Sequence, residues 1–264
     1  MAMNNRPIGV MDSGIGGLTV VRELQRLLPG EDIIYFGDSA NCPYGNRTTE
    51  QITQLSKNML QFLGDQGAKT TAIACNTIST LVDRLIPCFD YRIIGIVSPA
   101  ADAIARDGLR EVGLIATEFT ARSGAYEKLI HAHDPSIEVF AQGSPLLAGL
   151  VDRGDFNEEE INAEITTQVD KILARRRVSH IILGCTHYPI VEENFKKCYP
   201  EITFINPALE QAKAVQRYLT EQDAFSPKKR GTFTVCTSGD PQVYLNVAKR
   251  LGLFEPDDAK VVEI

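Results

Sequence analysis

Two cysteines, Cys75 and Cys185, occupy equivalent points of two similar sequence patterns. Each ends an apolar run typical of a buried strand, and each precedes a pattern typical of a helix. In open α/β sheets, ligands bind where a strand ends and the next helix begins, and the positive end of that helix favours a thiolate. The matching contexts therefore indicate a pair of thiols that act on one small molecule.

The residues after these cysteines distinguish them from the other thiols. Free cysteines usually pack as small hydrophobic side chains, whereas Asn76-Thr77 and Thr186-His187 suit helix caps or ligand contacts. The chain has six cysteines but no Cys-x-x-Cys pair, which argues for reduced thiols. Cys185 and His187 could hold a metal, but no second ligand pair is evident, so no metal is expected. The packing interpretation is kept for Cys88, Cys198 and Cys236.

Two thiols on opposite sides of a small molecule can invert a stereogenic carbon that carries a hydrogen. One thiolate removes the proton and the opposite thiol returns one, without a cofactor, where the site stabilises the carbanion-like transition state. A free thiol has a pKa of about 8.5, so a neighbouring group must help one cysteine to ionise near neutrality. Asp12 and His187 are the candidates, although Asp12 could instead be a turn former and His187 a structural hydrogen-bonding group.

The elements that position these residues follow from hydrophobic periodicity. Strands are expected at 8–11, 33–36, 70–74, 93–97, 112–116, 137–141, 179–184, 202–205 and 232–236. Helices are expected at 18–28, 48–63, 117–131, 158–177, 207–219 and 243–251, and from Pro189. Because strands and helices alternate almost throughout, the predicted fold class is α/β with mostly parallel sheets flanked by helices.

Two connections between these elements have functional features. The turn Gly14-Ile15-Gly16-Gly17 lacks the spacing of a dinucleotide fingerprint, and nothing about 20 residues on completes that motif. Its backbone N–H groups, at the start of a helix, could still hold a carboxylate. The segment 37–46 is too long for a simple connection, and such loops often carry function.

A weak internal repeat suggests two half-sites. Residues 112–117 parallel residues 8–13 at an offset of 104, and the two cysteines are 110 residues apart. Ser98-Pro99, between the two copies, marks a candidate crossing from one unit to the next. The repeat therefore predicts two half-sites that face each other.

Composition excludes several classes of protein. The chain has 264 residues, of which 44% are hydrophobic and 23% charged. Its net charge is −7, whereas a protein that binds nucleic acid usually carries an excess of positive charge. The N-terminus lacks the apolar core of a signal peptide, and no run of 18 apolar residues occurs. We therefore expect no membrane association and a cytoplasmic location.

Several motifs together resemble the cofactor-independent glutamate racemases of the aspartate/glutamate racemase family. They are Asp12–Gly17, Pro43–Asn46, Ala74–Thr77, Ser123–Tyr126 and Leu183–Pro189, and the match runs nearly end to end. Together with them, the run Tyr35–Asp38 favours glutamate over aspartate. The resemblance implies two pseudosymmetric α/β domains with the active site in the cleft between them. It also implies two-base interconversion of L- and D-glutamate at Cα, which supplies D-glutamate for peptidoglycan.

The resemblance also implies roles for individual residues. Cys75 would face D-glutamate and Cys185 would face L-glutamate, with Asp12 and His187 as their assisting groups. One domain would comprise 1–98 with 208–264 and the other 99–207. Glutamate would be the small-molecule partner, no cofactor would be needed, and a homodimer is compatible with the resemblance. Substrate contacts would fall on Asp12, Ser13, Tyr44, Gly45, Asn76, Thr77, Thr117, Thr120, Thr186 and His187.

Four positions depart from the commoner family pattern, and two alternatives stay open. Asn41 stands where Arg is expected, Ser144 where Cys is usual, Asp152 where Glu is usual, and Asn206-Pro207 where Asp-Ser is usual. The first alternative is a racemase for aspartate or a broader range of amino acids. The second is a non-catalytic two-lobed amino-acid-binding module, which would not need a thiol in both lobes.

Overall fold

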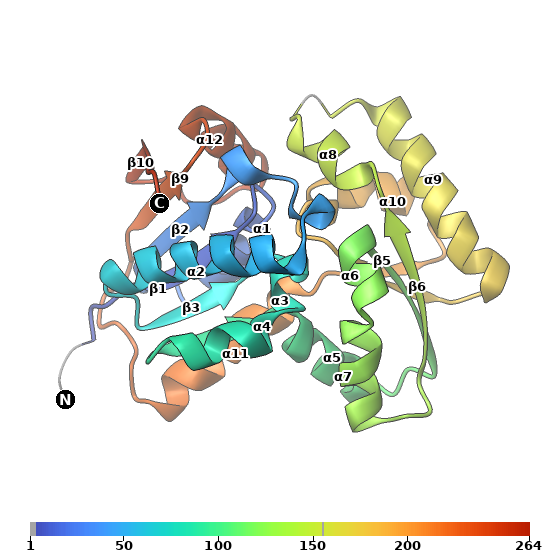
Figure 1. Cartoon of the computed structure of the whole chain (residues 1–264), viewed down its shortest axis with the longest axis horizontal. Helices are drawn as coiled ribbons and strands as arrows, with labels where there is room; N and C mark the ends of the chain where they lie inside the picture. Colours follow the sequence, from blue (N-terminus) through green and yellow to red (C-terminus); the bar gives the residue numbers. More distant parts are fainter. Residues whose placement is uncertain (1–3, 155) are drawn as a thin grey trace.

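The computed structural model describes residues 4–154 and 156–264, whose strands form two parallel sheets. The larger sheet has the order β10-β9-β2-β1-β3-β4, and the smaller has the order β6-β5-β7-β8. Figure 1 shows the two sheets side by side, each with helices packed against it. The expected α/β class with parallel sheets is confirmed. The strands are β1 (Ile8–Asp12), β2 (Ile33–Gly37), β3 (Thr70–Ile73), β4 (Arg92–Gly95), β5 (Glu111–Thr117), β6 (Glu138–Ser144), β7 (His180–Gly184), β8 (Thr203–Ile205), β9 (Phe233–Thr237) and β10 (Asp258–Val261).

Side-chain caps start several of the helices. Thr48 and Gln51 form the expected capping box at the start of α2, since each side chain accepts a hydrogen bond from the other residue's backbone N–H. Asn157 caps α9 by accepting from two backbone N–H groups. The helices are α1 (Leu18–Leu27), α2 (Thr49–Asp65), α3 (Asn76–Ser79), α4 (Val82–Leu85), α5 (Val97–Arg106), α6 (Glu118–Ser123), α7 (Ala125–His133), α8 (Leu147–Asp152), α9 (Glu158–Arg175), α10 (Glu192–Cys198), α11 (Ala208–Glu221) and α12 (Pro241–Arg250).

The larger sheet is buried on both faces because its side chains alternate between two apolar clusters. In β1, Ile8 and Val10 pack in one cluster with Leu24 of α1, whereas Met11 packs in the other with Ile52 of α2. All five residues of β1 are buried, and its last residue is Asp12. The buried strand therefore places the Asp12 side chain at the edge of the sheet where the parallel strands end.

Ser98-Pro99, the candidate crossing, lies in the first turn of α5, which connects β4 of the larger sheet to β5 of the smaller one; proline needs no N–H partner there. The structure corrects two other sequence predictions. The helix expected over 117–131 is two helices, α6 and α7, which Gly124 separates with a φ of 64°. β6 extends to Ser144, where a turn was expected, and the short helix α8 follows it.

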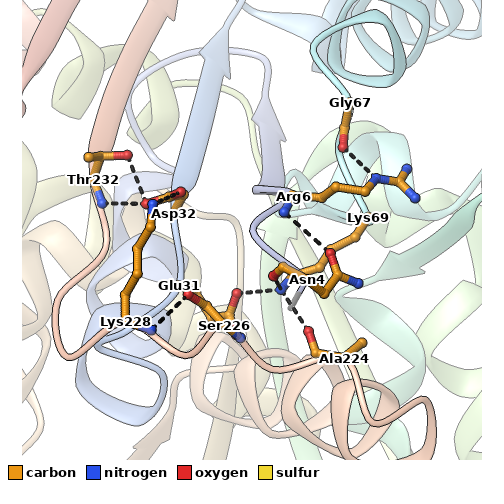
Figure 2. Close-up of polar contacts among 10 residues, drawn as sticks. All are labelled: Asn4, Arg6, Glu31, Asp32, Gly67, Lys69, Ala224, Ser226, Lys228 and Thr232. Atoms are coloured by element: carbon orange, nitrogen blue, oxygen red, sulfur yellow. Dashed lines mark hydrogen bonds and ion pairs between the residues drawn. The ribbon is translucent and has the colours of Figure 1, made fainter. Parts of the chain in front are cut away.

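A buried ion pair fixes the segment that returns the chain from α11 to the larger sheet (Figure 2). Lys69 Nζ lies 2.5 Å from Glu31 Oε2, and both side chains are 3% exposed. The ammonium also donates to the carbonyl of Ala224 at 2.8 Å, and Glu31 Oε1 accepts from the Ser226 N–H at 2.7 Å. Glu31 and Lys69 precede β2 and β3, so the pair lies at the amino edge of the sheet, opposite Asp12.

Candidate active site

The carboxyl ends of strands from both sheets meet at one cavity of about 20 Å³. Cys75 follows β3 of the larger sheet, and Cys185 follows β7 of the smaller sheet. Both side chains line the cavity and are only 5% exposed. The structure therefore brings the two predicted thiols together from opposite sheets. The lining consists of Ser13, Cys42, Pro43, Tyr44, Gly45, Cys75, Asn76, Thr77, Thr117, Ala148, Cys185, Thr186 and His187.

The predicted contact residues occupy two layers around this cavity. Asp12 and Thr120 stand behind the wall, each hydrogen-bonded to a residue that lines it, and the other predicted residues line it themselves. Sequence analysis did not single out three lining residues as contacts. Cys42 and Pro43 lie in the long segment 37–46, which was predicted to be functional, whereas no sequence signal marks Ala148.

Cys75 is held as a buried thiol. It precedes α3, and its Sγ lies 3.6 Å from Ser13 Oγ. Burial, and then the charge of Asp12, raise its pKa to about 12, while the Ile78 N–H and Ser13 oppose the shift. The N–H of Ile78 in α3 thus favours the thiolate, in the expected direction, but burial outweighs this effect.

Asp12 connects the two half-sites from behind the cavity wall. Its Oδ1 accepts from the Gly14 N–H at 3.0 Å, and its Oδ2 accepts from the Thr186 hydroxyl at 3.0 Å. Burial raises its pKa to about 6, although the charge of His187 and these two hydrogen bonds oppose the shift. A carboxyl group whose pKa lies this close to neutrality can gain and lose a proton under physiological conditions.

Cys185 lies next to the imidazole of His187. Its Sγ lies 3.7 Å from His187 Nδ1, and His187 Nε2 lies 2.8 Å from Asp152 Oδ1. Burial lowers the pKa of His187, but the hydrogen bonds to Asp152 and Cys185 outweigh burial and hold it well above its usual value. Burial likewise raises the pKa of Asp152, which His187 nevertheless brings below its usual value. The pair therefore favours an imidazolium between two acidic groups.

Hydroxyl groups from both sheets form another part of the site. The hydroxyls of Thr77 and Thr117 lie 3.0 Å apart, and that of Thr120 lies 3.2 Å from Thr77 and 3.0 Å from Thr117. The Thr77–Thr117 hydrogen bond joins the segment after β3 to the end of β5. These hydroxyls can donate to a carboxylate, so they suit an acidic substrate.

The loop before α2 closes one side of the cavity. Tyr44 donates a hydrogen bond to Asp38 Oδ2 at 2.6 Å, which fixes the loop against the end of β2. A Cβ atom at Gly45 would lie 3.2 Å from Thr117 Cβ, so glycine permits this close approach. In the described part of the chain, no three His, Cys, Asp or Glu side chains are grouped to hold a metal ion.

Two parallel sheets that each place a thiol on one cavity, with His187 on its wall and Asp12 behind it, provide the groups that a racemase or epimerase of the two-base type requires. The chain belongs to the Asp/Glu/Hydantoin racemase family, whose model matches residues 8–215. The family resemblance expected from the motifs is thereby confirmed.

The chain is similar to several glutamate racemases. The one from Thermoanaerobacter pseudethanolicus is 36% identical over 251 residues, which are 94% of each chain. The one from Corynebacterium diphtheriae is 37% identical over 254 residues, again 94% of each chain. The crystal structure of glutamate racemase from Francisella tularensis in complex with D-glutamate superposes with a TM-score of 0.90 at 32% identity, covering 99% of this chain and 98% of that one.

Proposed function

We propose that this protein interconverts L-glutamate and D-glutamate by proton transfer at Cα, with Cys75 and Cys185 as the two acid–base groups. The observation that carries the proposal is the placement of one thiol from each sheet on the same cavity. The product D-glutamate would serve peptidoglycan synthesis, and the reaction would take place in the cytoplasm. In the described residues, no helix combines the length and apolar character needed to cross a bilayer.

In the L-to-D direction, Cys185 takes the α-proton. The imidazolium of His187, held by Asp152, balances the thiolate charge that this step requires. Cys75 then delivers a proton to the opposite face of Cα, a role that suits a thiol whose pKa of about 12 keeps it protonated. The carbon–hydrogen bond broken on one face is thus replaced on the other, and configuration inverts.

In the D-to-L direction, Cys75 must first ionise. The charge of Asp12 raises the pKa of Cys75, so a proton on Asp12 lowers the free energy needed to form the thiolate. The ammonium group of bound glutamate acts in the same direction because it brings a positive charge next to the thiol. Asp12, with a pKa of about 6, exchanges that proton near neutral pH.

Substrate recognition is assigned to the polar wall of the cavity. Donors for the two carboxylates come from both sheets, so the ligand bridges the two half-sites. We assign residues 1–98 with 208–264 to one domain and 99–207 to the other, since these ranges contain the two sheets. The proposed contacts are those of the family: Asp12, Ser13, Tyr44, Gly45, Asn76, Thr77, Thr117, Thr120, Thr186 and His187.

The proposed substrate does not fit the cavity as it stands. A volume of about 20 Å³ accommodates roughly one water molecule, far less than an amino acid. Glutamate therefore enters only when the two half-sites separate, and their closure around it excludes water from the reacting carbon. Opening would break hydrogen bonds between the half-sites, among them those of Thr77 to Thr117 and of Thr186 to Asp12.

The test is the single replacement of each proposed acid–base thiol. Cys75→Ser and Cys185→Ser should each lower kcat for racemisation by about 10²- to 10⁴-fold, measured by circular dichroism with each enantiomer. Cys88→Ser is the control because Cys88 is exposed and does not line the cavity. Near-normal racemisation by either of the first two variants would exclude the two-thiol mechanism.

The two variants should differ in hydrogen exchange rather than in direction. Enantiomers have equal free energies in water, so kcat/KM must fall equally for L- and D-glutamate in any variant. In deuterium oxide, however, Cys75→Ser should still exchange the α-hydrogen of L-glutamate through Cys185 without inversion. Cys185→Ser should do the same for D-glutamate, and exchange of the opposite enantiomers would reverse the assignment of faces.

A further inference from the structure

The carboxamide of Asn76 has one satisfied end and one free end. Asn76 lines the cavity, and its side chain is 2% exposed. Its Oδ1 accepts a hydrogen bond of 2.7 Å from the hydroxyl of Tyr126, while its Nδ2 has no hydrogen-bond partner among the described residues. Burying an amide nitrogen without a hydrogen-bond partner destabilises a fold. Such a group in a native fold requires an explanation.

Tyr126 determines which end of the amide is free. Its side chain is 1% exposed, and burial together with the charge of Cys185 raises its pKa above the usual value, so the phenol stays protonated. The hydroxyl donates to the amide oxygen, which leaves the two N–H groups of Nδ2 for a ligand in the cavity.

We propose that Tyr126 is a positioning residue for substrate recognition: its hydroxyl orients the Asn76 carboxamide so that the amide nitrogen donates to a carboxylate of the bound amino acid. This inference rests on the proposed function. Without the Tyr126 hydroxyl, the amide could rotate and present its oxygen, which repels a carboxylate. Asn76 lies on α3, after β3 of the larger sheet, and Tyr126 lies on α7, after β5 of the smaller sheet. Their hydrogen bond therefore orients the amide when the two half-sites close.

The direct test measures ligand binding without turnover. The probe is α-methylglutamate, which lacks an α-hydrogen and cannot be racemised, and its Kd is measured by titration calorimetry. Tyr126→Phe should raise this Kd about 3- to 10-fold, the effect of losing one hydrogen bond. The KM for L-glutamate should rise by a similar factor with kcat within about twofold, because the lost interaction is made equally in the ground and transition states.

Two further variants separate orientation of Asn76 from a general structural effect. Tyr199→Phe removes another buried, hydrogen-bonded hydroxyl, which donates to Asp170 away from the cavity, and should leave Kd and KM unchanged. Asn76→Ala should raise Kd more than Tyr126→Phe does. Adding Tyr126→Phe to Asn76→Ala should have no further effect on Kd, since the hydroxyl acts only through the amide.

The outcomes distinguish this inference from the proposed function. An unchanged Kd in Tyr126→Phe, fully additive effects in the double variant, or no binding of α-methylglutamate to the wild type would each overturn the role of Tyr126. A wild type that binds the analogue and shows the expected change in Kd, but does not racemise glutamate, would overturn the proposed function alone.

Discussion

The buried carboxylate of Asp12 destabilises the fold, and the proposed reaction depends on the raised pKa that burial causes. Its folded-state pKa of about 6 lies above the ordinary pKa of 3.8 for an aspartate side chain, so ionisation favours the unfolded chain. The stability that its protonated form contributes is fully present below pH 3.8 and is lost as the pH rises through about 6. With about 1.4 kcal/mol per pKa unit, the loss at pH 8 is about 3 kcal/mol.

Asp12→Asn should therefore stabilise the protein while it impairs catalysis. The amide oxygen can still accept from the Gly14 N–H, and the amide nitrogen can donate to the Thr186 hydroxyl, so no buried polar group loses its partner. We expect a higher Tm than the wild type at pH 8, little difference at pH 4, and a kcat about 10²- to 10⁴-fold lower.

Thermal unfolding from pH 4 to pH 9 and racemisation assays check this prediction. The matched control is Asp65→Asn, which removes the same charge at the exposed end of α2. A Tm for Asp12→Asn that falls below the wild type at pH 8 would contradict the idea that burial of this charge is destabilising.

At the residue scale, local motifs could be predicted from sequence, but their distant partners could not. Cys75, Cys185 and His187 stand next to recognisable strand ends, so their spacing was informative. Asp152 lies 35 residues before His187, and only the fold brings the two side chains together. The pKa of Cys75 could not be predicted either, because a sequence does not show how completely a thiol is buried.

Among the elements, α8 positions the carboxylate that holds His187 next to Cys185. The hydroxyl of Ser144 accepts from the Leu147 N–H at 3.0 Å and donates to the buried Glu164 at 2.7 Å, which fixes the start of the helix. The last residue of α8 is Asp152, whose carboxylate holds His187. Ser144, which stands where the family usually has Cys, therefore acts on the site from the far end of this helix.

Ser144→Ala should loosen α8 and lower the pKa of His187. Burial lowers that pKa, and the hydrogen bond to Asp152 opposes burial, so a weaker hydrogen bond lets burial dominate. The alkaline limb of the kcat profile, where the imidazolium is lost, should move to lower pH, and kcat should fall several-fold. Stability should fall by about 1–3 kcal/mol because Glu164 loses a donor and the N–H of Leu147, at the start of α8, loses its acceptor.

The control for Ser144→Ala is a variant that removes a hydrogen bond at the start of another helix. Asn157→Ala removes the cap of α9, which should reduce stability by about 1 kcal/mol without moving the pH profile. Equal pH profiles for wild type and Ser144→Ala, despite a lower Tm, would show that the start of α8 does not control His187.

Long elements could be predicted from sequence, and short ones could not. The helices α2 and α9 show several turns of apolar periodicity and side-chain caps, so both were predicted. The helices α4 and α8 have four and six residues, too few for a helical period to be recognised. β6 was predicted too short because it is an edge strand with mostly half-buried residues, so its hydrophobic pattern is weak.

For the whole molecule, the internal repeat predicted two half-sites but not the unequal sheets. The larger sheet gains β9 and β10 from the end of the chain, and β9 pairs with β2 so that Ile33 lies opposite Phe233. Periodicity marks β9 as a strand but contains no information about a neighbour 200 residues away. Contacts with residues far away in the sequence must therefore fix the segment before β9.

The Glu31–Lys69 ion pair provides such contacts, and removing one charge should destabilise the fold without reaching the cavity. Lys69→Met leaves the carboxylate of Glu31 buried without its ammonium partner, which should reduce the free energy of unfolding by about 3–5 kcal/mol. Glu31→Gln in the Lys69→Met background removes the unpaired charge and keeps an oxygen for the Ser226 N–H. The double variant should therefore recover much of that loss.

Because the pair lies at the amino edge of the sheet, kcat per folded molecule should be unchanged in both variants. Urea unfolding monitored by circular dichroism measures the stabilities, and a double variant no more stable than Lys69→Met would show that packing, rather than charge, holds the segment.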